Sequence, residues 1–146
     1  SPIIQPSIKQ KPLKGKKMFY YFDRQNFRIV EATADEIIHT FSEETTSPRG
    51  IEPKFFYEDG SLWYWTARGE RHHFKGCTKE EAEQQLLSWA IADASNCEYS
   101  TSIYPSKQEV LDDLKNELED EGRWDLEDAW DVEIRAKLNQ VLEENK

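Results

Sequence analysis

Aromatic and apolar residues in the stretch 53–77 form three short runs separated by two turn-forming sites, a pattern that predicts a three-stranded meander. Asp59 and Gly60 lie between the first two runs, and an Asp-Gly pair readily takes the positive φ angles that a tight hairpin turn needs. Gly69 separates the second run from the third in the same way. We expect the rest of the chain to cover this sheet or to extend from it.

The middle strand of the meander is apolar or aromatic on both faces. Successive side chains of a strand point to opposite faces, so Leu62 and Tyr64 share one face and Trp63 and Trp65 share the other. A sheet with one solvated face shows polar residues at alternate positions, and this strand does not. Either protein covers both faces, or one aromatic face is a docking surface. Because aromatic residues are usually buried, we expect both faces to be covered.

A second set of strands is predicted in residues 18–31, as a hairpin with its turn at residues 24–26. Residues 96–105 lack any periodicity and are predicted to be an irregular connection. The predicted fold class is therefore α+β. It consists of one antiparallel sheet of about five strands, a packed helix, and an acidic helical pair at the C-terminus.

Helix-start signals occur at three places. Thr33 with Glu36, and Thr78 with Glu81, have the spacing of a capping box, in which each side chain bonds the other residue's backbone N–H. Ser106 is a plausible N-cap for a third helix. The helix after Thr78 should lie across the sheet. It carries apolar residues at helical spacing at Ala82, Leu86, Leu87, Ala90, Ile91 and Ala94.

The C-terminal third of the chain is predicted to form two helical segments, separated at Gly122. Each segment has one apolar stripe that we expect to be buried. The first stripe consists of Val110, Leu111, Leu114 and Leu118. The second consists of Leu126, Trp130, Ile134, Leu138 and Val141 or Leu142.

Charge divides the 146 residues into three regions. Residues 1–17 carry five lysines and no acidic residue, and they are predicted to be a flexible basic arm. Residues 18–104 are predicted to be an α+β core domain. Residues 105–146 carry fourteen acidic and six basic residues, and they are predicted to be an acidic helical extension packed on the core. The net charge of −10 opposes non-specific binding to nucleic acid.

The acidic extension suggests a function, because a carboxylate-rich helical surface complements a basic surface on another protein. We expect a non-enzymatic interaction, regulatory or inhibitor protein; alternatively, these carboxylates are only solvated, or the chain is a structural subunit of a larger assembly. The candidate partner-binding residues are Asp112, Asp113, Glu117, Glu119, Asp120, Glu121, Asp125, Glu127, Asp128 and Asp131.

A second hypothesis is a nucleic-acid-binding module, because aromatic residues on an open sheet can stack on single-stranded bases. Removing the basic arm should then lower the affinity and flatten its salt dependence. The candidate residues are Lys9, Lys11, Lys14, Lys16, Lys17, Trp63, Trp65, Arg71 and Lys75, with Phe56 on the same face.

The three strands and the capped helix FKGCTKEEAEQQLLSWA together loosely resemble the arm-type DNA-binding modules of tyrosine-family integrases. The resemblance covers residues 53–94 and rests on this pattern. It implies a three-stranded sheet laid on DNA with a helix packed behind it. Residues 53–77, however, carry four basic and three acidic side chains, a field too weak to hold a duplex firmly.

Catalytic and metal chemistry finds little support in this sequence. Adjacent strand residues point to opposite faces, so His72 and His73 are poorly placed to bind one ion. Cys77 is expected to be a small buried residue rather than a nucleophile. No phosphate loop or hydrolase motif occurs, so we expect no enzyme activity, no metal and no cofactor.

The cellular setting is predicted from the two cysteines, Cys77 and Cys97. Two are too few for a disulfide scaffold and favour free thiols in a reducing, cytoplasmic compartment. No apolar run approaches the roughly twenty residues of a membrane span, so we expect no membrane partner.

Overall fold

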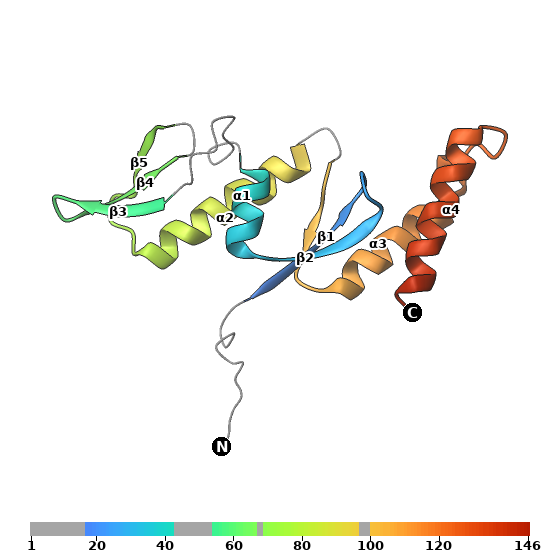
Figure 1. Cartoon of the computed structure of the whole chain (residues 1–146), viewed down its shortest axis with the longest axis horizontal. Helices are drawn as coiled ribbons and strands as arrows, with labels where there is room; N and C mark the ends of the chain where they lie inside the picture. Colours follow the sequence, from blue (N-terminus) through green and yellow to red (C-terminus); the bar gives the residue numbers. More distant parts are fainter. Residues whose placement is uncertain (1–16, 43–53, 67–68, 97–99) are drawn as a thin grey trace, which may run out of the picture.

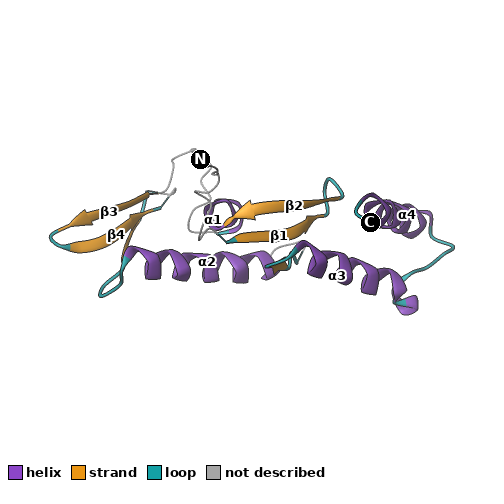
Figure 2. Cartoon of the chain, turned by 90° about the horizontal axis from the view of Figure 1, so that it is seen from below, coloured by secondary structure: helices purple, strands orange, loops and turns teal. Residues whose placement is uncertain are grey.

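The computed structural model describes residues 17–42, 54–66, 69–96 and 100–146. Lys9, Lys11, Lys14, Lys16 and Cys97 lie outside the described residues. The described elements follow one another along a row: a small sheet at one end, two helices in the middle, then a second sheet and a helical pair (Figures 1 and 2). The fold class is α+β.

The sheet in the centre of the molecule has the strand order β2-β1-β6, and both pairings are antiparallel. Strands β1 (Met18–Asp23) and β2 (Arg28–Thr33) form the predicted hairpin. In its turn, the Asp23 carboxylate accepts hydrogen bonds from the backbone N–H groups of Gln25 and Asn26. Strand β6 (Ile103–Tyr104) pairs with the other edge of β1.

The other sheet, at one end of the molecule, is the predicted meander, with strands β3 (Lys54–Glu58), β4 (Ser61–Trp65) and β5 (Arg71–His73). Both residues of its first turn have positive φ, +52° at Asp59 and +74° at Gly60, as the Asp-Gly pair predicted.

The prediction of one five-stranded sheet is wrong: the chain forms two separate three-stranded sheets. Helices α1 (Ala34–Phe41) and α2 (Lys79–Asn96) lie between the two sheets (Figure 2), and β6 supplies the third strand of the central sheet. This strand comes from the stretch that was predicted to be irregular. Only two of its residues pair with β1, too few to leave a period-2 pattern in the sequence.

Helix α1 (Ala34–Phe41) and helix α2 (Lys79–Asn96) begin where the capping boxes predicted. At α1, Thr33 Oγ1 accepts from the Glu36 N–H and the Glu36 carboxylate accepts from the Thr33 N–H. Thr78 and Glu81 make the same reciprocal pair at α2. Helix α2 passes beneath the meander and continues beneath α1 towards the central sheet (Figure 2).

Helix α3 (Lys107–Glu119) has the predicted N-cap, Ser106. It is followed by one 3-10 turn, η3 (Glu121–Arg123), which contains Gly122, and then by α4 (Ala129–Glu144).

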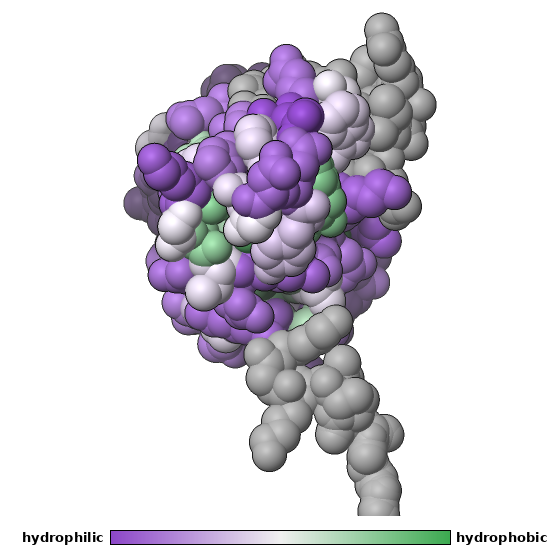
Figure 3. All heavy atoms as spheres, turned by 90° about the vertical axis from the view of Figure 1, so that its left-hand side faces the viewer, coloured by the Kyte–Doolittle hydropathy of each residue, from purple (hydrophilic) through white to green (hydrophobic). Residues whose placement is uncertain are grey.

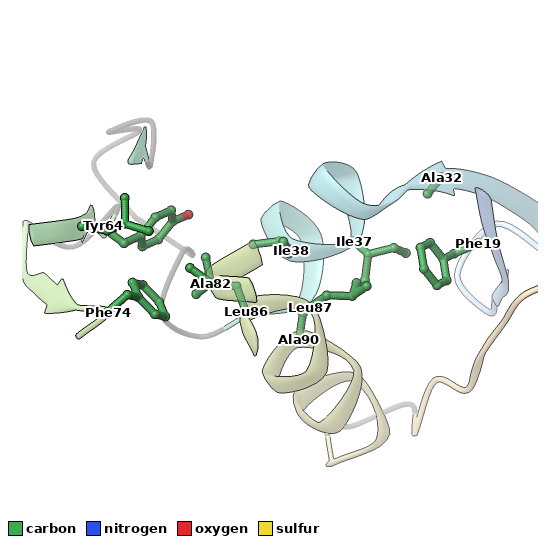
Figure 4. Close-up of a cluster of buried hydrophobic side chains, with 11 residues drawn as sticks. Phe19, Ala32, Ile37, Ile38, Tyr64, Phe74, Ala82, Leu86, Leu87 and Ala90 are labelled. Atoms are coloured by element: carbon green, nitrogen blue, oxygen red, sulfur yellow. The ribbon is translucent and has the colours of Figure 1, made fainter. Parts of the chain in front are cut away.

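Two hydrophobic clusters form on opposite faces of β1. Phe19 belongs to the α1–α2 cluster, which runs from Tyr64 and Phe74 of the meander end through both helices (Figure 4). Phe22, on the other face of the strand, belongs to the α3–α4 cluster with Leu138 and other residues of these helices. The alternation of strand side chains thus lets β1 join both halves of the molecule.

Most of the predicted apolar stripe on α3 is buried, at Val110, Leu114 and Leu118. The stripe on α4 is buried only in part: Leu138 and Val141 are inside, while Leu126 and Trp130 are exposed. The prediction that these two are buried is wrong. The helix starts after its N-cap Asp128, so Leu126 precedes it and Trp130 lies in its first turn.

Candidate binding surfaces

The first candidate surface is the acidic tip, defined here as residues 119–131, where the chain turns from α3 into α4. It lies at the opposite end of the molecule from the meander (Figure 1). Four aspartates hold its backbone. Asp120 accepts from the Gly122 N–H, Asp125 from the Glu127 N–H, Asp128 from the Trp130 N–H and Asp131 from the Asp125 N–H. These carboxylates therefore shape the loop as well as charge it.

Glu117, just before the tip, is held by contacts within the fold. Its carboxylate bonds to the guanidinium groups of Arg24, from the β1–β2 turn, and of Arg123, from η3. Its side chain is only 13% exposed. The indole of Trp124 donates a hydrogen bond of 3.0 Å to the Glu117 carbonyl. This predicted partner-binding residue thus ties the tip to the central sheet.

Asp112 and Asp113 lie on α3, away from the tip. The Asp112 carboxylate accepts from the side-chain amide of Gln108, one helical turn earlier. Burial, with the neighbouring Asp113 carboxylate as a second cause, raises the pKa of the Tyr104 hydroxyl.

Three carboxylates of the tip remain available to another molecule. The side chains of Glu119, Glu121 and Glu127 are exposed, and none forms a hydrogen bond or ion pair with another residue in the described part of the chain. They give the tip three negative charges that pair with no other residue in the described part of the chain.

The tip also carries two exposed large apolar side chains. Leu126 is 63% exposed and Trp130 is 69% exposed. Sequence periodicity placed both on a buried stripe. For Leu126, the signal that could have corrected the prediction is Asp128. An aspartate followed by a good helix former starts a helix, so the helical stripe cannot extend back to Leu126.

The second candidate surface is the outer face of the meander. Strand register places two rows of side chains on it. Lys54, Trp65 and Arg71 are paired across the sheet in one row, and Phe56, Trp63 and His73 in the next. We call these six residues the aromatic sheet face. Strand alternation directs Leu62 and Tyr64 to the other face, where they join the α1–α2 cluster.

The rings of the aromatic sheet face pack against one another. His73 stacks on Trp63 with 4.5 Å between ring centroids and 14° between planes, and Phe56 meets Trp65 edge-on at 6.3 Å. The Arg71 guanidinium lies 4.3 Å from the Trp63 centroid and also pairs with Glu58. No described helix covers this face (Figure 2), and Figure 3 shows pale and apolar residues among the charged ones at this end.

The remaining candidates of the nucleic-acid hypothesis are spread out. Lys75 is exposed in the turn after β5, off the sheet face. Lys17 immediately precedes β1 in the sequence, and its ammonium group lies 5.6 Å from the ring centroid of Phe19. The structure therefore brings together Trp63, Trp65 and Arg71 and leaves these two lysines apart.

The histidines and Cys77 of the meander end lie apart from one another in their contacts. His73 faces Trp63, whereas His72 faces Trp89 of α2 at 6.1 Å, so the two imidazoles point to opposite sides as predicted. Cys77 is a half-buried free thiol against the α1–α2 cluster. Among the described residues, no group of three or more His, Cys, Asp or Glu side chains could hold a metal ion.

No helix in the described part of the chain is both long and apolar enough to cross a bilayer.

Comparisons with protein-family models, with curated proteins and with solved structures found no match to this chain.

Proposed function

We propose that this chain is a non-enzymatic protein-binding protein whose acidic tip docks on a basic surface of another protein. The observation that carries the proposal is the exposure of Leu126 and Trp130 in a segment, residues 119–131, that is also rich in carboxylates. Tryptophan is the residue type most enriched among the hot spots of protein interfaces, and apolar anchors inside a charged rim are typical of such sites.

The partner that fits this tip has an apolar socket surrounded by Lys or Arg. Burying the two anchors would supply affinity, while the free carboxylates of Glu119, Glu121 and Glu127 would steer the encounter and fix its orientation. An inhibitor or regulator of a basic enzyme is one concrete form of this function.

The backbone of the tip supports such a role because it is held before any partner arrives. The aspartate hydrogen bonds and the Trp124–Glu117 bond fix the loop that presents the anchors. A preorganised surface loses less conformational entropy on binding than a flexible one.

The test is an affinity pull-down from native extract, at low and high salt and with or without nuclease. We expect protein partners that survive nuclease and are released by high salt. Two variants, Leu126→Ser with Trp130→Ser, and the triple change of Glu119, Glu121 and Glu127 to Lys, should each lose these partners.

The matched control changes Glu80, Glu143 and Glu144 to Lys. These three residues are exposed and lie outside the tip, and the change in net charge is the same. The control should retain the partners, and thermal melting should show that all variants are folded. Equal capture by wild type and by both tip variants would overturn the proposal.

A further inference from the structure

The aromatic sheet face is unused by the proposed function and lies at the other end of the molecule (Figure 1). From its geometry we propose that it is a second binding site, which stacks the bases of a short single-stranded nucleic acid and contacts the phosphates with Lys54 and Arg71.

The first step is the arrangement of the rings. Trp63 and Trp65 are two residues apart on β4, so their side chains project from the same face about 7 Å apart along the strand. Phe56 and His73 flank Trp63 on the neighbouring strands. Aromatic side chains presented in this way on a sheet are suited to stacking with unpaired bases, and this stacking tolerates any sequence.

The second step is charge. The chain carries a net charge of −10, yet the row across the sheet at Trp65 has a cation on each side, Lys54 and Arg71. The nearest carboxylate on this face, Glu58, lies at the turn end of β3 and pairs with Arg71. The face therefore combines aromatic rings and a local excess of positive charge, which suits a ligand that has both planar bases and phosphates.

The small number of cations on this face favours single strands over a duplex. A duplex shields its bases and is held mainly by many phosphate contacts, whereas this face offers two lysine or arginine side chains. Glu58 already pairs with Arg71, so about one to two phosphates are neutralised on a single strand. The logarithm of the affinity should then fall with the logarithm of salt concentration with a slope between about −0.7 and −1.4.

The experiment measures the anisotropy of fluorescein-labelled 12-nucleotide DNA and RNA single strands, and of the matching DNA duplex, titrated with the full chain. We expect both single strands to bind more tightly than the duplex. Trp63→Ala and Trp65→Ala should each weaken binding by about 5-fold to 150-fold, because stacking contributes about 1–3 kcal/mol per base. Lys54→Gln with Arg71→Gln should weaken binding and flatten the salt slope.

Trp130→Ala is the matched control: it removes an exposed tryptophan from the acidic tip and should leave the affinity for oligonucleotides unchanged. Trp63→Phe preserves a stacking ring and keeps the test valid if Trp63→Ala fails to fold. The proposal is overturned if neither single strand binds, if the duplex binds as tightly, or if the tryptophan and cation variants bind like wild type. It is also overturned if the face instead pairs two copies, seen as a dimer that Trp63→Ala converts to monomer.

Discussion

The aromatic sheet face and the acidic tip both place tryptophan at the surface, but in opposite ways. His73 stacks on Trp63 and the Arg71 guanidinium lies 4.3 Å from the Trp63 centroid, so neighbouring side chains leave this ring half-buried. Trp130 is 69% exposed in the first turn of α4. One surface is a set of rings in mutual contact, whereas the other presents two exposed apolar side chains, Leu126 and Trp130, near the start of α4.

This difference follows from the secondary structure beneath each surface. A strand has two faces, so burying Tyr64 in the core forces Trp63 and Trp65 outwards together, where cross-strand neighbours pack against them. A helix has one apolar stripe that packs on its neighbour. Residues just before the helix, or in its first turn, can project past the end of that neighbour and stay exposed. Platforms therefore arise from sheets, and single anchors arise at helix ends.

The largest expected effect comes from truncating the two hydrophobic clusters. Leu86→Ala in the α1–α2 cluster and Leu138→Ala in the α3–α4 cluster each truncate a leucine that is at most 1% exposed. Each should lower the free energy of unfolding by about 2–5 kcal/mol, since a buried cavity replaces the side chain. Chemical denaturation measures this loss.

Amide hydrogen exchange shows whether each leucine variant destabilises its own end of the molecule. The Leu86 variant should exchange faster in β4, and the Leu138 variant in α4, because the two leucines belong to different clusters. Both should speed exchange in β1, which contributes to both clusters. Identical exchange patterns in the two variants would show that the ends do not differ in local stability.

An intermediate effect is expected at Glu117, the carboxylate that links the tip to the central sheet. Glu117→Gln removes the negative charge that two guanidinium groups share, and it leaves Arg24 half-buried without its partner. We expect a loss of about 1–3 kcal/mol in the free energy of unfolding, typical of hydrogen bonds to charged groups.

Glu119→Gln is the control for this prediction. It makes the same chemical change at an exposed residue two positions away and should alter stability by less than about 0.5 kcal/mol. If the two variants melt alike, the Arg24–Glu117 contact contributes nothing to stability, and Glu117 returns to the set of residues free to meet a partner.

The sequence predicted local structure well where one residue type sets the backbone. Asp59 and Gly60 fixed the hairpin turn, and Thr33 and Thr78 fixed two helix starts, because these side chains act on their own neighbours. Strand alternation also placed Trp63 and Trp65 on one face, whereas only the register shows that Lys54 and His73 share it.

Contacts between distant segments were beyond prediction from the sequence. Strand β6 pairs with β1 through Tyr104 and Tyr20, more than eighty residues apart. Arg24 and Glu117 are 93 residues apart, and neither carries a local signal of its partner. The same limit explains the acidic set: ten carboxylates looked alike in sequence, and only the folded chain separates those that cap or pair from the three that are free.

The smallest expected effect separates the structural and electrostatic roles of one carboxylate in the tip. Asp128 is the N-cap of α4, and its side chain accepts from the Trp130 N–H at 2.9 Å. Asp128→Ala should cost about 1 kcal/mol of stability, whereas Asp128→Asn should cost almost nothing, because asparagine caps equally well. Thermal melting measures both.

If the proposed partner contacts this charge directly, Asp128→Asn weakens binding while the melting temperature stays the same. If Asp128 acts only as a cap, Asp128→Asn binds like wild type and only Asp128→Ala loses affinity. A variant pair that melts alike would contradict the capping role, and would return Asp128 to the carboxylates that serve the surface alone.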